Sequence, residues 1–345
     1  MISTLLASMA GSAVVMANAS NFAVIEPSDF MLIDSAEVPV MTAVVRASRP
    51  FRELILSWEA DTPGDSQLEF IVKPAISQER SYNMGSWSAS AKRTSVNDQK
   101  DALGEVQTDI LILREDCITF RVDVHLKVTD SAKPKLKKLY AILTPTTPDE
   151  SRLSGNRAAW GKLIDAPKKA QMDYPGGQSL CSPTSVSMIV NHWGLQKNVP
   201  EWIRDVPEVQ RGVHDPGWGG TGNWPFNTAY ASSLPGLQGF ITRLRGIEDL
   251  EHWIVAGVPV ATSVSYSLLK GEPKRRANDG HLVVLVGFTQ SGDPIFNDPG
   301  RKEIRLTYKR SNFEQAWNSS KRTVYIIKPI DWRGPSISGP WPTQS

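Results

Sequence analysis

Residues 181–194, CSPTSVSMIVNHWG, and residues 278–300, NDGHLVVLVGFTQSGDPIFNDPG, decide the fold of the second half of the chain. In the first stretch, a Ser-Pro pair suits a first helical turn, apolar residues follow at helical spacing, and Gly194 is expected to end the helix. Cys181 then lies at the amino terminus of a helix. The helix dipole and the free backbone N–H groups there favour a thiolate, so Cys181 is a candidate nucleophile.

The second stretch predicts a hairpin that carries a base and a carboxylate. His281 opens an apolar strand, the chain turns near residues 291–293, and Asp298 ends the returning strand. Adjacent antiparallel strands would bring Asp298 beside His281, where a carboxylate accepts the imidazole N–H and stabilises the imidazolium. A lone cysteine is usually inert core, and a lone histidine or aspartate is usually structural. The spacing of the three therefore carries the prediction.

The first half of the chain has a different pattern, with a period of two from residue 22 to about residue 144. In residues 121–128, RVDVHLKV, one face is aliphatic and the other polar, as a half-buried antiparallel strand requires. Similar runs occur at 41–46, 53–58, 68–72, 109–113 and 138–143, separated by turn residues such as DTPGD. Short strands at this spacing predict a β-sandwich or jelly roll.

These patterns predict four segments. Residues 1–20 form a possible signal or disordered segment, 21–146 a β-sandwich domain, 147–330 a second domain, and 331–345 a flexible tail rich in Pro, Gly and Ser. The second domain is expected to be α+β, with a helix at 248–256 and strands at 258–266, 281–288 and 324–328. Residues 17–19, Ala-Asn-Ala, look like a signal-peptidase site, but no lysine or arginine precedes Arg46. A cytoplasmic and a secreted protein both remain open.

Composition excludes several classes of protein. The chain has 345 residues, 40% of them hydrophobic, which is enough to bury a core in each of two domains. Lysine and arginine number 38 against 36 acidic residues, so there is no basic excess for nucleic acid. No apolar run is long enough to predict a membrane span. Two cysteines exclude a disulfide framework, and no histidine pair has metal-ligand spacing, so we expect no metal or organic cofactor.

The chemistry-bearing stretches resemble the papain-superfamily cysteine peptidases related to bacteriocin leader peptidases. The likeness rests on QMDYPGGQSLCSPTS, GTGNWPFNTAYA, AGVPVATSVSY, GHLVVLVGF with NDP, and RSNFEQAW, in that order over about residues 165–330. The resemblance implies a papain-like domain with Cys181 as nucleophile, His281 as general base and acid, and Asp298 as the orienting residue.

The oxyanion donor departs from the family pattern. Papain-like enzymes place a glutamine about six residues before the nucleophile, and here that position is Pro175. Gln171 and Gln178 are the two candidates. We favour Gln171, because the Gly176-Gly177 turn can loop out the extra residues, whereas Gln178 lies close to the sulfur in sequence.

These features predict a cysteine peptidase that hydrolyses a peptide or isopeptide bond in a peptide or protein substrate through a thioacyl intermediate. Two alternatives remain open: a cysteine-dependent amidase or acyltransferase, and a catalytically silent binding protein that uses the β-sandwich to recognise glycan or protein. Trp218 and Trp224, in a Gly-rich segment, are candidate substrate-binding residues. The basic run from Lys270 to Arg276 is either a solvated loop or a rim that selects acidic peptides.

Overall fold

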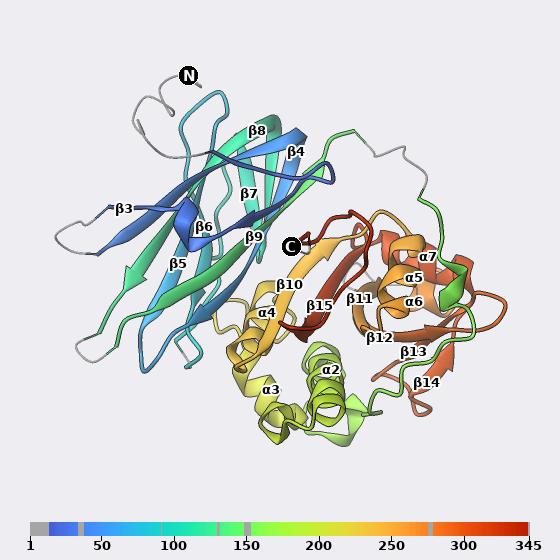
Figure 1. Cartoon of the computed structure of the whole chain (residues 1–345). Coiled ribbons are helices and arrows are strands. Elements are labelled where there is room, and N and C mark those ends of the chain that lie inside the picture. The colour runs from blue at the N-terminus through green and yellow to red at the C-terminus, as the bar shows by residue number, and fades with distance from the viewer. Residues whose placement is uncertain are drawn as a thin grey trace. The chain divides into compact units, whose positions relative to one another are not determined.

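Figure 1 shows the computed structural model of the chain, which describes residues 14–33, 38–90, 92–129, 132–147, 153–274 and 279–343. The described residues fall into two compact units. Unit 1 comprises the described part of Met1–Glu150 together with Asp215–Ala229 and Pro340–Pro342. Unit 2 comprises the described part of Ser151–His214 and Tyr230–Gly339, together with Thr343.

Unit 1 is built from antiparallel strands, as its period of two predicts, with one parallel pair between β1 and β4. The described strands form one nine-stranded sheet in the order β2-β9-β4-β8-β5-β6, with β1 and β3 on β4 and with β7 on β8. Their bounds are β1 Val14–Met16, β2 Phe22–Ile25, β3 Met31–Ile33, β4 Val40–Asp61, β5 Gln67–Pro74, β6 Tyr82–Trp87, β7 Gly104–Gln107, β8 Ile110–Lys127 and β9 Lys135–Pro145. The all-β character of the first half is thus confirmed.

Two long strands replace two pairs of short ones. The runs predicted at 41–46 and 53–58 both belong to β4, and those at 109–113 and 121–128 belong to β8. The pairing register of β4 with β8 shifts between Arg46 and Phe51. Such irregularities bend a strand without ending it, so the alternation is interrupted although the strand continues.

The core of unit 1 contains a cluster of large aromatic side chains. Trp58 stacks on Phe70 with ring centroids 4.1 Å apart, and Trp87 lies 6.5 Å from Trp58. Phe226, from Asp215–Ala229, packs against both tryptophans at 6.3 and 5.5 Å. The segment 215–229 therefore contributes to the hydrophobic core of unit 1, although the sequence placed it inside one continuous second domain.

Buried polar contacts also fix this segment. The carboxylate of Asp215 is fully buried and accepts hydrogen bonds from the backbone N–H groups of Ser95 and Gly217 at 2.9 and 3.0 Å. Its other oxygen accepts from the amide of Asn223 at 2.9 Å. The sequence pattern around Trp218 and Trp224 does not predict the contact with Ser95, 120 positions earlier.

Unit 2 combines helices with a six-stranded antiparallel sheet in the order β10-β15-β11-β12-β13-β14. The strands are β10 Leu237–Arg243, β11 Val260–Ser265, β12 Gly280–Phe288, β13 Pro294–Asn297, β14 Arg305–Thr307 and β15 Thr323–Pro329. The helices are α2 Cys181–Lys197, α3 Val206–Val213, α4 Trp224–Ser233, which begins in unit 1, α5 Ile247–Val255, α6 Tyr266–Leu269 and α7 Arg310–Asn318. The predicted α+β class is confirmed.

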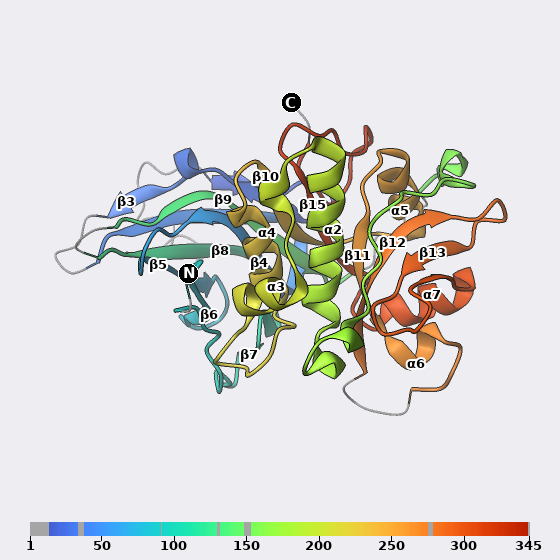
Figure 2. The ribbon, with the colours of Figure 1, turned by 90° about the horizontal axis from the view of Figure 1, so that it is seen from below.

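Helix α2 packs against β12, β15 and β11, and Figure 2 shows it running alongside this sheet. The indole of Trp193 donates to the carbonyl of Ile327 at 2.8 Å, which ties the end of α2 to β15. Gly194 does not end the helix. It allows close packing instead, because a Cβ at this position would lie 2.8 Å from a side-chain carbon of Ile203, and the helix continues to Lys197.

Three predictions concern the ends of the chain. Residues 1–13 lie outside the described residues, while Val14–Met16 pairs with β4. In the tail predicted at 331–345, the indole of Trp332 donates to the carbonyl of Ala256 at 2.9 Å and Trp341 is 3% exposed, so these two side chains are packed. The predicted boundaries at residues 20, 146 and 330 stay predictions. In the described part of the chain, no helix is long and apolar enough to cross a membrane.

Candidate active site

The sulfur of Cys181 lies at the start of α2, as the sequence predicts. Cys181 is the first residue of the helix, and its side chain is half-buried. The backbone amides of Ser182 and Leu282 donate to the sulfur, so the helix start and the neighbouring strand β12 both stabilise negative charge on it. This is the environment in which a thiol becomes a nucleophile at neutral pH.

His281 and Asp298 meet as the predicted hairpin requires. His281 is the second residue of β12, Asp298 follows β13 directly, and β12 and β13 are antiparallel neighbours. The imidazole Nε2 lies 2.7 Å from Oδ1 of Asp298. Both side chains are buried, His281 with 6% and Asp298 with 0% exposure. Since Nε2 is engaged by the carboxylate, Nδ1 is the ring nitrogen left for the hydrogen bond with Cys181.

Asp298 has two further donors that sequence reasoning missed. The hydroxyl of Tyr308 donates to Oδ2 at 2.6 Å, and the backbone N–H of Gly300 donates to Oδ1 at 2.9 Å. Both carboxylate oxygens are therefore hydrogen-bonded in a buried site. Tyr308 follows β14 directly and belongs to none of the quoted motifs.

These contacts control the charges of the three groups. Burial alone would raise the pKa of Cys181, but the hydrogen bond and the charge of His281 outweigh it and lower the pKa of the thiol. Burial opposes the imidazolium, yet Asp298 and Cys181 together raise the pKa of His281 to about 10. Burial would also raise the pKa of Asp298, but the hydrogen bond from His281 lowers it. The site thus favours a thiolate and an imidazolium held by a carboxylate.

Gln171 and Gln178 have different environments. Gln171 is 5% exposed, and its backbone N–H donates to the carbonyl of Pro299 at 2.9 Å. Its side-chain Nε2 donates to the carbonyl of Gly177 at 2.7 Å, while its Oε1 has no hydrogen-bond partner in the described structure. The acceptor at Gly177 fixes the orientation of the amide and uses one of its two protons. Gln178 is exposed on the next turn.

The two predicted substrate-binding tryptophans lie in unit 1, whereas the residues described above lie in unit 2. Trp218 is 45% exposed and its ring covers Gly220 and Gly222. Trp224 is half-buried, and its backbone N–H donates to Asp109 at 2.7 Å. Their role in substrate binding stays a prediction.

Comparison with known proteins shows which family the chain resembles. Residues 163–325 match the model of the Peptidase C39 like family, and residues 34–144 match the Peptidase C39 N-terminal domain. Residues 163–325, which contain Cys181, His281 and Asp298, are therefore similar to the Peptidase C39 like family. The resemblance found in the sequence is confirmed by this match, and the match supports a peptidase.

Solved structures give weaker likenesses. A protein described as a C39-like peptidase from Bacillus anthracis is 18% identical, with a TM-score of 0.38, over 50% of this chain and 98% of its own. The GH26-CBM35 β-(1,4)-mannanase of Podospora anserina is 9% identical, with a TM-score of 0.20, over 50% of this chain and 34% of its own. A family two carbohydrate esterase from Cellvibrio japonicus is 15% identical, with a TM-score of 0.19, over 42% of each chain. No curated protein matches the chain significantly.

Proposed function

We propose that the protein is a cysteine peptidase that hydrolyses a peptide or isopeptide bond with Cys181, His281 and Asp298. The observation that carries the proposal is the continuous chain of hydrogen bonds from the half-buried sulfur at the start of α2 through the imidazole to a buried carboxylate. This arrangement supplies a nucleophile, a proton donor and a group that orients the donor.

In the first half of the reaction, the thiolate of Cys181 attacks the carbonyl carbon of the substrate and the carbonyl oxygen takes up negative charge. The backbone N–H of Cys181 and the second Nε2 proton of Gln171 donate to that oxygen. The imidazolium of His281 gives its Nδ1 proton to the departing amine as the C–N bond breaks. A thioester of Cys181 and a free amine result, and His281 is neutral.

In the second half, neutral His281 takes a proton from water, and the resulting hydroxide attacks the thioester carbon. The C–S bond breaks, the sulfur leaves as a thiolate, and the acid product is released. The protonated imidazole and the thiolate are thereby restored. Asp298 stays ionised throughout and stabilises the imidazolium whenever it forms.

The rate of alkylation of Cys181 by iodoacetamide against pH tests the proposal, read peptide by peptide by mass spectrometry. We expect a thiolate titration well below the usual value of about 8.5 for a free thiol, and its loss in His281→Ala. Cys117 is an internal control, because it is 1% exposed and burial raises its pKa to about 11. A Cys181 profile like that of a free thiol, unchanged in His281→Ala, would refute the proposed pair.

Cleavage of a mixed-sequence peptide library by the full chain then identifies the reaction, with Cys181→Ala as the blank. Fragments with a new free carboxyl end support hydrolysis. Products in which an added amine has replaced the leaving amine, with little free acid, would show an acyltransferase instead.

A further inference from the structure

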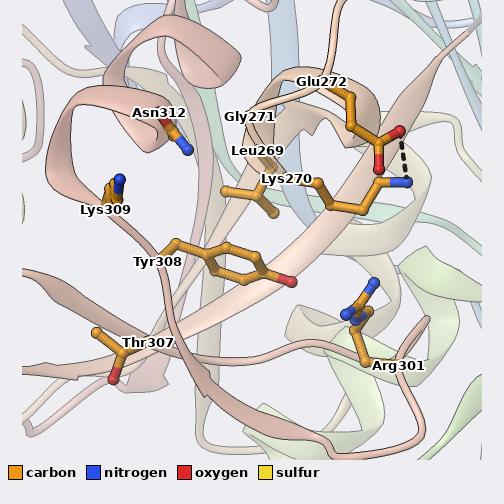
Figure 3. A pocket seen from close by; sticks show the side chains of 9 residues that line it. All are labelled: Leu269, Lys270, Gly271, Glu272, Arg301, Thr307, Tyr308, Lys309 and Asn312. Atoms are coloured by element: carbon orange, nitrogen blue, oxygen red, sulfur yellow. Dashed lines mark hydrogen bonds and ion pairs between the residues drawn. The ribbon is translucent and has the colours of Figure 1, made fainter.

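Unit 2 contains a second feature that the proposed chemistry does not use, an open pocket of about 590 Å³. Figure 3 shows the side chains that line it, which come from the end of α6 and the residues after it, from Arg301, and from the end of β14 and the start of α7. The side chains that matter here are Lys270, Glu272, Arg301, Tyr308, Lys309 and Asn312. We call this site the basic pocket.

The lining of the basic pocket carries more positive than negative charge. Three of its side chains are cationic and one is anionic. Lys270 is paired with Glu272 at 3.2 Å. Arg301 and Lys309 form no ion pair with any residue that the structure describes. Two cationic groups around one hollow therefore remain available to an anion.

The amino terminus of α7 lies beside the pocket. Lys309 is the N-cap residue of the nine-residue helix and gives it no side-chain capping bond. The backbone N–H of Arg310 donates to Oδ1 of Asp293 at 2.9 Å, so a carboxylate already caps the start of the helix, and the preference for an anion rests on the cations of the pocket. Asn312, in the first turn, points into the pocket in Figure 3 and lies close to Gly271, where a Cβ would be 2.7 Å from its Nδ2.

The basic pocket is connected to Cys181, His281 and Asp298 through two tyrosines. The hydroxyl of Tyr308, which lines the pocket, donates to Asp298. The ring of Tyr266 lies 4.6 Å from the ring of His281, and the ammonium of Lys270 lies 4.6 Å from the ring centre of Tyr266. Because these two distances meet at the Tyr266 ring, the Lys270 ammonium lies no more than about 9 Å from the imidazole of His281. Tyr266 also hydrogen-bonds to Arg301, which raises the pKa of Arg301.

This position decides which part of a substrate would reach the pocket. His281 must contact the departing amine to protonate it, so the chain after the broken bond leaves past His281 rather than along α2. An extended chain advances about 3.3–3.6 Å per residue, so the Lys270 side of the pocket lies within about three residues of the imidazole. A carboxylate fits a pair of cations in both charge and hydrogen-bonding geometry.

We propose that the basic pocket binds a carboxylate of the substrate two or three residues after the bond that is broken. The inference rests on the proposed peptidase function and names the substrate class for it. The carboxylate has two possible sources, an Asp or Glu side chain in the departing segment or the carboxyl end of a short departing peptide.

Binding is measured by calorimetry in the full chain carrying Cys181→Ala, which lacks the proposed nucleophile. The probes are N-acetyl-glutamate N-methylamide and N-acetyl-alanine, each against its neutral amide analogue. We expect both carboxylate probes, but neither amide, to bind, and affinity to fall at least about tenfold in Arg301→Gln/Lys309→Gln. The matched control is Lys302→Gln, an exposed lysine next to Arg301 that does not line the pocket.

Cleavage of the peptide library by the wild-type chain separates the two sources. Enrichment of Asp or Glu at the second or third position after the cut, lost in Arg301→Gln/Lys309→Gln, supports a side-chain carboxylate. Preference for short departing peptides with a free over an amidated end supports the terminal carboxylate.

Carboxylate binding that is absent, or equal in the double variant and the Lys302→Gln control, would overturn the assignment of the pocket. A library without either preference would overturn it too. Because the binding assay needs no catalysis, these results are distinct from a failure of the alkylation experiment, which would refute the peptidase proposal itself.

Discussion

Removal of one hydroxyl group, in Tyr308→Phe, tests how strongly the buried carboxylate of Asp298 depends on its neighbours. The hydroxyl donates to Oδ2 at 2.6 Å, and Asp298 is 0% exposed while Tyr308 is 9% exposed. Water therefore cannot replace the lost donor easily. A hydrogen bond to a charged group contributes about 1.5–3 kcal/mol, and we expect the variant to lose that much stability at neutral pH.

The chain offers a matched control in Tyr174→Phe. The hydroxyl of Tyr174 donates to Oδ1 of Asp205 at 2.8 Å, but the side chain of Asp205 is 63% exposed. Both variants remove a hydrogen bond from a tyrosine hydroxyl to an aspartate, and only the burial of the pair differs. The control variant should therefore lose less than about 1 kcal/mol of folding stability. Hydrogen–deuterium exchange of peptides from β12 and β13 measures the opening free energy of this part of unit 2.

The pH dependence has a definite sign. The pKa of Asp298 is lowered in the folded chain, so its stabilisation is present above the unfolded value of about 3.9 and is lost as pH falls through the folded value. Tyr308→Phe moves the pKa of Asp298 back toward its usual range. The stability difference from wild type should be full at neutral pH and shrink in acid. Equal losses in the two Tyr→Phe variants, or a Tyr308→Phe loss that persists unchanged in acid, would refute this reasoning.

Three further predictions concern other parts of the chain. Gln171→Ala should lower kcat about 10²–10³-fold by removing an oxyanion donor, whereas Gln178→Ala should leave kcat unchanged. The pH profile of Cys181 alkylation should stay unchanged in both variants. Equal effects of the two substitutions on peptide cleavage would contradict the choice of Gln171. Phe226→Ala should destabilise unit 1 by about 3–5 kcal/mol, because the 1% exposed ring packs between two tryptophans in the core. Chemical denaturation followed by tryptophan fluorescence measures the free energy of unfolding. A loss of stability below about 1 kcal/mol would count against that packing. Asp123→Asn should destabilise unit 1 at neutral pH but not in acid. Burial would raise the pKa of Asp123, but hydrogen bonds from Thr42 and Lys73 lower it. Thermal unfolding measured across pH checks this expectation, and a loss of stability that grows in acid would contradict it.

Local patterns predicted the elements of unit 2 well. The helix expected at 248–256 is Ile247–Val255, and the strand expected at 281–288 is Gly280–Phe288. The turn near residues 291–293 contains Gly292 with φ +87°, a conformation that glycine adopts without strain. Each of these features depends on neighbours in sequence, and so the hairpin that joins His281 to Asp298 could be predicted.

Contacts between distant segments could not be predicted in the same way. The sequence around Asp215 signals turns, but its partner Ser95 lies 120 residues earlier and only the fold brings them together. Tyr308 is similar, because nothing in the local pattern distinguishes a tyrosine after a short strand from a packing residue. The local pattern predicts a helix end at Gly194, whereas its lack of a side chain serves packing against Ile203. The local sequence indicates which conformations and contacts a residue can adopt, and tertiary contacts determine which of them it adopts in the fold.

The segment Asp298-Pro299-Gly300 links the proposed catalytic groups more closely than the motif alone suggests. The Asp298 carboxylate orients His281, and the N–H of Gly300 donates to that carboxylate. The carbonyl of Pro299 accepts the backbone N–H of Gln171, so three consecutive residues hold both the base and the favoured oxyanion donor. A Cβ on Gly300 would lie 3.0 Å from Cε1 of His281, so a side chain at this position would crowd the imidazole. Gln171 lies farther from Cys181 in sequence than the family pattern places its glutamine. This is compatible with an ordered oxyanion site, because the position of Gln171 depends on the segment 298–300 rather than on its distance in sequence from Cys181.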